Sequence, residues 1–193
     1  MNKRTLRMMT EMTLAGIIAF VLAYFSQSLA NQIGGFDLAL VLIPLVWLAL
    51  RHGSASAILV AALVGLVDGL VKVGMSDFLV LIGQYVAPLL AVGLAGLFAK
   101  YSQKTLNNKR YSSTYLNIYT GTLLAVLVYF VIKQVLMPLA LGEGIAFDWL
   151  SALLAWLVIA TLIALFARLN PDFLIPKRSK YLSRKETSSL LND

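Results

Sequence analysis

The stretch LIGQYVAPLLAVGLAGLFAK, residues 81–100, is nearly all apolar, yet it contains the polar pair Gln84 and Tyr85 and a proline at position 88. A run of about 20 apolar residues matches the roughly 30 Å hydrocarbon core of a bilayer. Such runs recur along the 193 residues, of which 60% are hydrophobic and 13% charged. Soluble domains carry about 25% charged residues. The sequence therefore predicts an all-α integral membrane protein.

Six apolar segments are expected to form one compact bundle of transmembrane helices within residues 1–168. They are residues 10–30, 37–50, 54–74, 78–99, 117–141 and 146–167. The second segment is short and contains Pro44, which predicts a kinked or tilted helix. We expect residues 101–113 to form a cytoplasmic loop, and residues 169–193 to form a solvated basic tail near anionic lipid headgroups.

The distribution of charge predicts that both termini are cytoplasmic, because positive residues accumulate on that side of a membrane. Basic residues gather at the two termini and after the second and fourth segments. The other connecting segments carry four acidic residues, Asp37, Asp77, Glu143 and Asp148. The net charge of +7 thus reflects topology in a multi-pass plasma-membrane protein, and nucleic acid is not expected as a partner. A cleavable signal peptide over residues 1–30 is an alternative, but Glu11 fits poorly in its basic region.

Motifs for catalysis and metal binding are absent from the sequence. The chain has no cysteine and one histidine, His52, so neither a thiolate nor a histidine metal site is expected. It also lacks GxxxxGK[ST], GxSxG and HExxH patterns. We therefore expect no catalytic residues, no metal and no cofactor, and interpret the chain as a binder or carrier and not an enzyme.

Four polar side chains lie inside the predicted spans: Asp68, Lys72, Gln84 and Lys133. A charged residue at the centre of a bilayer costs roughly 2.5–3.5 kcal/mol or more, so such residues should face the bundle interior. Asp68 and Lys72 are spaced to pair on one helix face, either as a structural pair or in a functional role. Lys133 is expected either to extend to the outer surface or to point into a cavity.

Pro88 accounts for part of the polar character of residues 81–100. Pro88 has no N–H, so the carbonyl of Gln84, four residues earlier, loses its helical partner. With the amide of Gln84 and the ring of Tyr85, this predicts a small-molecule pocket in the outer half of the bundle. A kink stabilised by interhelical hydrogen bonds is the alternative. Trp149 and Trp156 are expected to add stacking surfaces to the pocket.

Small residues at four-residue spacing predict close helix packing. They occur as Gly65 and Gly69 in the third segment, and as Ala15 and Ala19 in the first. Each motif is expected to pack within the bundle. Ala15 and Ala19 lie near the cytoplasmic end, where they are also candidates for contact with a partner protein.

The chain resembles the thiamine-specific S components (ThiT/YuaJ family) of energy-coupling factor (ECF) transporters. The resemblance rests on Ala15-x-x-x-Ala19, Gly34-Gly35, Ile43-Pro44, LALRHG at 48–53, Gln84-Tyr85-Val86-Ala87 and Gly93-Leu94-Ala95-Gly96. It implies a subunit that binds thiamine or a thiamine precursor and works with a transmembrane coupling subunit and two ATPases. It also implies that Ala15 and Ala19 contact the coupling subunit and that residues 26–37 cover the pocket.

Several positions differ from the family pattern. Gln84 stands where the family has an acidic residue before the tyrosine, and Lys133 stands where it has a histidine. Trp149 aligns with a family tyrosine. These changes favour a neutral aminopyrimidine or an anionic vitamin over cationic thiamine, although Asp68 is a candidate to restore negative charge. The alternatives are an S component for another vitamin, a proton-coupled secondary transporter that uses Asp68, Lys72 and Lys133, and a non-transporting scaffold.

Overall fold

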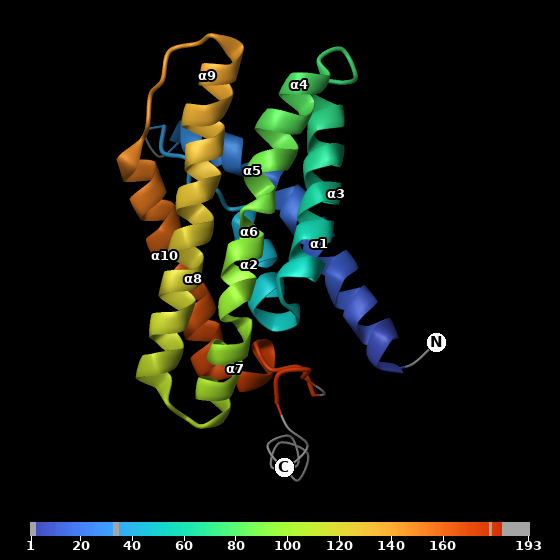
Figure 1. Cartoon of the computed structure of the whole chain (residues 1–193), viewed down its shortest axis with the longest axis vertical. Coiled ribbons are helices and arrows are strands. Elements are labelled where there is room, and N and C mark those ends of the chain that lie inside the picture. Colours follow the sequence, from blue (N-terminus) through green and yellow to red (C-terminus); the bar gives the residue numbers. More distant parts are fainter. Residues whose placement is uncertain (1–2, 33–34, 178, 183–193) are drawn as a thin grey trace.

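The computed structural model of the protein describes residues 3–32, 35–177 and 179–182, and these residues form helices and connecting turns without a β-strand (Figure 1). The elements are α1 Lys3–Gln32, α2 Leu42–His52, α3 Ser54–Lys72, α4 Phe78–Val80, η1 Leu81–Val86, α5 Ala87–Leu90, α6 Val92–Ala95, η2 Gly96–Phe98, α7 Ala99–Asn107, α8 Tyr111–Val131, η3 Ile132–Leu136, α9 Met137–Leu141, α10 Trp149–Leu169 and η4 Pro171–Phe173. The elements from α4 to α7 follow one another as a single broken helix, as do α8, η3 and α9.

Within the described residues, five helical stretches are long and apolar enough to cross a membrane: Thr5–Ser26, Ser54–Lys72, Phe78–Asn107, Tyr111–Leu141 and Trp149–Leu169. The sixth apolar helix, α2, has 11 residues. At 1.5 Å per residue it covers about 16 Å, roughly half of the hydrocarbon core. Most residues of α2 are buried, and Leu42, Leu45 and Leu48 are fully covered. The predicted all-α bundle is confirmed, and its second segment is a short central helix.

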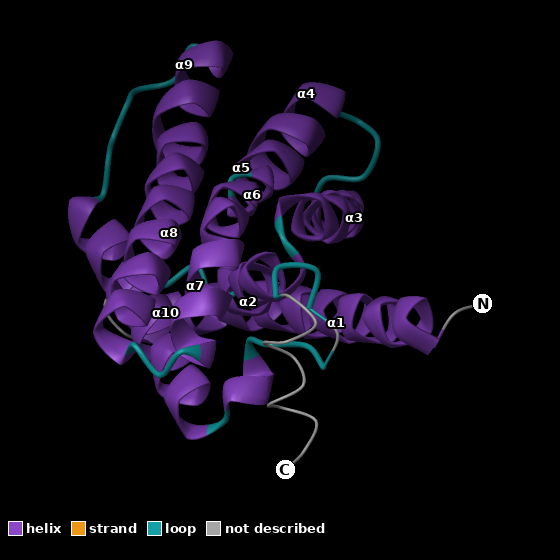
Figure 2. Cartoon of the chain, turned by 60° about the horizontal axis from the view of Figure 1, so that its bottom comes forward, coloured by secondary structure: helices purple, strands orange, loops and turns teal. Residues whose placement is uncertain are grey.

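Helix α1 lies at a large angle to α8, and its first turns project beyond the other helices (Figure 2). Its 30 residues cover about 45 Å at 1.5 Å per residue, which exceeds the thickness of the hydrocarbon core. A helix of this length fits a bilayer when it is tilted.

The glycines of the third segment determine how closely α3 approaches η1. A Cβ atom at Gly65 would lie 2.6 Å from the carbonyl oxygen of Tyr85, and one at Gly69 would lie 3.2 Å from the Tyr85 Cβ. A side chain at Gly65 would therefore force the two helices apart. The GxxxG motif packs inside the bundle as expected, and it fixes the position of Tyr85.

Ala15 and Ala19 are fully buried in the hydrophobic core, on the face of α1 that packs against α2 and α3. The opposite face of α1 is exposed and apolar, with Leu14, Ile17 and Ile18 among its residues. This differs from the expectation that the two alanines contact a coupling subunit. Their small side chains allow α1 to approach the chain's own helices, and those helices cover them.

The polar stretch 101–113 is not a loop, contrary to the expectation from its composition. Helix α7 continues to Asn107 and α8 begins at Tyr111, so the turn is confined to residues 108–110. Gln103 is buried on one face of α7, where its side-chain amide donates hydrogen bonds of 2.8 Å to the carbonyls of Leu50 and Arg51. Gln103 thus caps the end of α2, and the stretch continues α7 as an amphipathic helix.

Part of the expected solvated tail packs against the bundle. Leu174, Ile175 and Leu182 are buried, and the Trp47 indole donates a 2.7 Å hydrogen bond to the carbonyl of Phe173. Residues 183–193 lie outside the described residues. The division of the chain after residue 168 stays a prediction.

Candidate ligand-binding site

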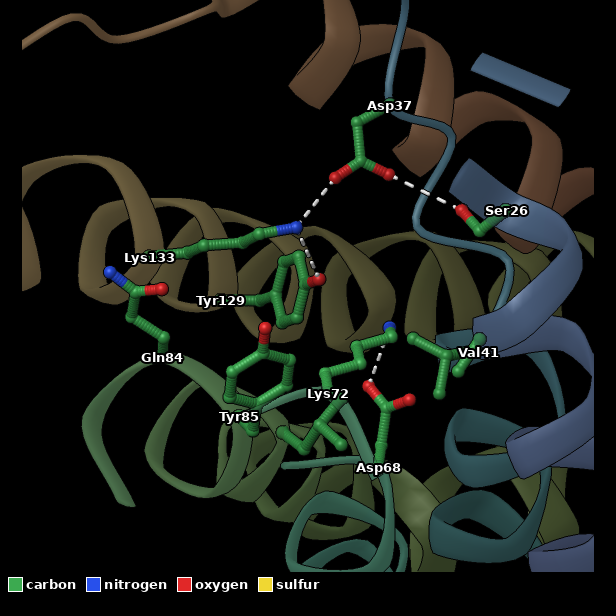
Figure 3. A pocket seen from close by; sticks show the side chains of 11 residues that line it. Ser26, Asp37, Val41, Asp68, Lys72, Gln84, Tyr85, Tyr129 and Lys133 are labelled. Carbon is green, nitrogen blue, oxygen red and sulfur yellow. Dashed lines mark hydrogen bonds and ion pairs between the residues drawn. The ribbon is translucent and has the colours of Figure 1, made fainter. Parts of the chain in front are cut away.

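A pocket of about 450 Å³ lies between α1, α3, η1, α8 and η3 (Figure 3). It is lined by Ala23, Ser26, Asp37, Val41, Asp68, Lys72, Gln84, Tyr85, Leu89, Tyr129 and Lys133. This volume is within the roughly 300–1,000 Å³ range of small-molecule sites. The topology predicted from the charge distribution would place this half of the bundle on the outer side of the membrane.

The amide and the phenol of the opening stretch reach the pocket from a π-helical turn. Residues Leu81–Val86 form this turn, and the N–H of Ala87 donates to the carbonyl of Ile82, five residues back. Pro88 follows just after the turn, so the missing N–H is accommodated by a wider turn. Both Gln84 and Tyr85 lie within it, and both line the pocket.

The broken helix formed by α8, η3 and α9 contains a π-helical turn of the same kind. Residues Ile132–Leu136 form a π-helical turn in which the N–H of Met137 donates to the carbonyl of Ile132, and Pro138 follows. Lys133 lies in this turn and points into the pocket (Figure 3). The Gln-x-x-x-Pro pattern therefore occurs in both pocket-lining helices, at positions 84–88 and 134–138.

An ion pair joins the two sides of the pocket entrance. The Lys133 ammonium donates hydrogen bonds to Asp37 Oδ2 at 2.8 Å and to the Tyr129 hydroxyl at 3.2 Å. Asp37 Oδ1 accepts a hydrogen bond from the N–H of Ala39 at 2.8 Å, and another from the Ser26 hydroxyl at 3.4 Å. The side chains of Lys133 and Asp37 keep 38% and 28% of their surface exposed, so the pocket is not sealed at this end.

Burial raises the pKa of Asp37, but this effect is outweighed by several lowering effects, of which the charge and the hydrogen bond of Lys133 are the largest. The hydrogen bonds from the Ala39 N–H and the Ser26 hydroxyl act in the same direction. The pKa of Asp37 consequently lies below its ordinary value, and the carboxylate is ionised at neutral pH.

A second ion pair lies deeper along α3. Lys72 Nζ is 2.9 Å from Asp68 Oδ2, which confirms the predicted pairing. The same ammonium lies 5.5 Å from the centre of the Tyr85 ring, and the Lys133 ammonium lies 5.4 Å from the centre of the Tyr129 ring. The pocket therefore holds two sets of an aspartate, a lysine and a tyrosine (Figure 3), but only Lys133 also hydrogen-bonds its tyrosine.

The structure brings four of the predicted site residues together: Asp68, Gln84, Tyr85 and Lys133. Of the two alternatives for Lys133, the structure shows the side chain that points into a cavity. Among the described residues, the Gln84 side chain has no hydrogen-bond partner, whereas the Gln134 amide oxygen accepts a 2.8 Å hydrogen bond from the Asp148 N–H. Gln84 is thus available to a ligand.

Trp149 and Trp156 do not line the pocket, in contrast to the expectation. Trp149 is 71% exposed and packs edge-on against Phe147, with 4.4 Å between ring centres. Trp156 donates a 3.0 Å hydrogen bond to the carbonyl of Tyr119. The buried face of α10, which includes Ser151 and Ala155, carries small residues that let it approach the bundle. Both tryptophans therefore lie away from the pocket.

Seven lining residues were not predicted as site residues: the polar Ser26, Asp37, Lys72 and Tyr129, and the apolar Ala23, Val41 and Leu89. Tyr129 lies four residues before Lys133, and this spacing places both on one helix face. Asp37 is 96 residues away from Lys133 in sequence, so no local pattern connects its charge with the pocket. Of the segment expected to cover the pocket, residues up to Gln32 continue α1, and residues 33–34 lie outside the described residues.

Comparisons with known proteins agree with this architecture. The family model described as thiamine transporter protein (Thia_YuaJ) matches residues 9–137. The solved structure of ThiT from Listeria monocytogenes is similar, with a TM-score of 0.71 and 19% identity over 91% of this chain and 100% of that chain. At this identity the likeness shows a shared fold. A comparison with curated proteins finds no match.

The family match covers more than half of the chain and agrees with the resemblance noted from Ala15-x-x-x-Ala19 and Gln84-Tyr85. It also agrees with the interpretation of the chain as a carrier. Five long apolar helices account for its place in the membrane. The chain therefore belongs to the thiamine transporter protein family, as a multi-pass transport protein of the cell membrane and not an enzyme.

Proposed function

We propose that the chain is the substrate-binding S component of an ECF-type transporter, which takes up thiamine or a thiamine precursor from outside the cell. The observation that carries this proposal is the pocket in the outer half of the bundle, where Gln84 and Tyr85 meet two ion pairs. The lack of a P-loop motif in the sequence fits a subunit that depends on separate ATPases.

The pocket offers hydrogen bonds and stacking to a flat heteroaromatic ring. The Gln84 amide carries two donors and one acceptor, which complement the amino group and ring nitrogen of an aminopyrimidine. Tyr85 offers a ring and a hydroxyl, while Ala23, Val41 and Leu89 contribute apolar walls. A few placed polar groups within apolar walls are typical of sites that fix a ligand's orientation.

The contact with a coupling subunit belongs to the same proposal. Because Ala15 and Ala19 are buried, we assign this contact to the exposed apolar face of α1, which includes Ile17 and Ile18. Substitution of Ile17 by Trp is expected to reduce co-purification of the coupling subunit and the ATPases. Ala15→Trp is expected to unfold the bundle, a result that thermal melting distinguishes from a lost contact.

Uptake assays test the proposal. The chain alone in proteoliposomes is expected to bind labelled thiamine or its pyrimidine without accumulating either. Accumulation is expected only with the coupling subunit, the ATPases and ATP. If neither compound binds the chain, or ATP does not drive uptake in the full assembly, the proposal fails.

A second candidate is a proton-coupled secondary transporter, which the two aspartate–lysine pairs in the pocket favour. Such a transporter would accumulate its substrate in vesicles that contain only this chain and a proton gradient. That result would replace the ECF proposal.

A further inference from the structure

We infer that Lys72 and Lys133 are specificity-determining residues that make the pocket select an uncharged heteroaromatic ligand, the aminopyrimidine part of thiamine without its cationic thiazolium. This inference rests on the proposed function and narrows its substrate class. Thiamine itself would then be the weaker ligand. The argument depends on the positions of the two lysines and on the charge balance of the pocket.

Both aromatic rings that line the pocket already have an ammonium group nearby. Lys72 Nζ lies 5.5 Å from the ring centre of Tyr85, and Lys133 Nζ lies 5.4 Å from that of Tyr129. A cation is attracted to an aromatic face within about 6 Å of the ring centre. A thiazolium that approached either ring would therefore meet a like charge, and the repulsion is stronger in a partly desolvated pocket than in water.

The carboxylates of the pocket are also engaged. Asp68 accepts from Lys72 at 2.9 Å, and Asp37 accepts from Lys133 at 2.8 Å. The second oxygen of Asp37 accepts hydrogen bonds from Ser26 and Ala39. Two aspartates and two lysines sum to zero charge among the residues that line the pocket. The pocket thus has no surplus carboxylate for a cation and no surplus ammonium for an anion.

The polar group that remains for a ligand is neutral. The Gln84 amide lies in the pocket without a hydrogen-bond partner among the described residues, at the position that precedes Tyr85. An amide matches an uncharged edge that both donates and accepts hydrogen bonds. Such an edge is present on an aminopyrimidine, whose ring can also stack on apolar walls formed by Val41 and Leu89.

Two substitutions in one ion pair test the inference in opposite directions. Lys72→Met leaves Asp68 without its partner and gives the pocket a negative charge, whereas Asp68→Asn gives it a positive charge. Binding of thiamine and of 4-amino-5-hydroxymethyl-2-methylpyrimidine would be measured by titration calorimetry on the purified full chain near neutral pH. A purely structural pair would weaken both ligands in both variants.

The wild type is expected to bind the pyrimidine at least about tenfold more tightly than thiamine. Lys72→Met should raise the affinity for thiamine relative to the pyrimidine by about tenfold, and Asp68→Asn should lower this ratio by a similar factor. Gln84→Glu adds a negative charge without breaking an ion pair. It should raise thiamine affinity as well, and it replaces Lys72→Met if that variant does not fold.

Wild-type protein that binds thiamine as tightly as the pyrimidine, or more tightly, would overturn the inference and leave the proposed function standing. The inference also fails if Lys72→Met and Asp68→Asn shift the ratio of the two affinities in the same direction. If neither ligand binds the wild type, the proposed function itself fails, so the two failures can be distinguished.

Discussion

Two clusters of hydrogen-bonded polar side chains lie toward opposite ends of the bundle and differ in what surrounds them. At the inner end, Glu11 accepts hydrogen bonds from Arg51 Nε at 2.7 Å and Nη2 at 2.8 Å, and His52 Nε2 lies 2.6 Å from it. At the outer end, Asp37 and Lys133 form their pair at the edge of a cavity.

The inner cluster is closed. Arg51 is 4% exposed, and its remaining nitrogen donates to the carbonyls of Asp172 and Phe173, so every guanidinium nitrogen has a partner. This cluster fastens α1, α2 and the segment after α10 to one another. The outer pair keeps a third or so of its surface open and has an unpartnered amide, Gln84, in the same pocket. The comparison indicates that saturated polar clusters hold the fold and that an incompletely satisfied one is available to a ligand.

The largest effect should come from breaking the inner cluster. Arg51→Met leaves two backbone carbonyls and part of Glu11 without their donors, which should lower the free energy of unfolding by about 3–5 kcal/mol. Arg7 contacts the same Glu11 but is 53% exposed, so Arg7→Met should change the stability by no more than about 1 kcal/mol.

Thermal unfolding of both variants in detergent measures the difference. If Arg51→Met melts within the error of Arg7→Met, the inner cluster does not hold the fold.

The second-largest effect should distinguish Gln84 from Gln134, the two glutamines that lie four residues before a proline. Gln84→Ala should weaken ligand binding by about 10- to 100-fold, because a hydrogen-bonding group in the pocket is lost, and should leave the melting temperature nearly unchanged. Gln134→Ala should do the reverse, because the amide of Gln134 holds the N–H of Asp148 at the start of α10. We expect it to lower stability by about 1 kcal/mol with little effect on binding. Calorimetry and melting on both proteins test this crossed pattern, which equal losses in both assays would contradict.

A smaller effect is expected from acid on the outer pair. The pKa of Asp37 is below its ordinary value, so its ionised form stabilises the fold above the unfolded-state value of about 3.9. This contribution is lost as the pH falls through the folded-state pKa. Between about pH 5 and pH 3 the wild type should lose about 1 kcal/mol more stability than Asp37→Asn. Melting curves at several pH values with parallel slopes for the two proteins would show that the pair is not stabilising.

The smallest effect is expected at Trp149. It is 71% exposed and does not line the pocket. Trp149→Phe should therefore change ligand affinity by less than about twofold. A larger loss of affinity would show that Trp149 contributes to the binding site, as expected from the sequence.

The helices could be predicted from the sequence because each span needs about 20 apolar residues. The pocket position could be predicted from Gln84, Tyr85 and Pro88, since a polar pair beside a proline has few structural uses in a bilayer. The prediction of a loop at residues 101–113 was wrong because polar residues in this stretch belong to the amphipathic helix α7. The side chain of Gln103 points inward from this helix and is buried.

The remaining features depend on tertiary contacts that no local pattern contains. The pairing of Asp37 with Lys133 joins residues 96 positions apart. An AxxxA motif indicates close packing, but Ala15 and Ala19 do not specify whether the neighbour belongs to the same chain or to another. For the same reason the orientation of Trp149 could not be derived from its position near the start of α10.

The most direct test of the pocket uses the absence of cysteine from the chain. Gln84→Cys introduces a single thiol at the pocket, and Asn108→Cys introduces one at the exposed turn on the inner side. In intact cells, a membrane-impermeant thiol reagent added outside should label Gln84→Cys and not Asn108→Cys, and bound thiamine or pyrimidine should protect the thiol at 84. Absence of labelling at position 84 from outside, or labelling that saturating ligand does not slow, would contradict an outward-facing binding pocket.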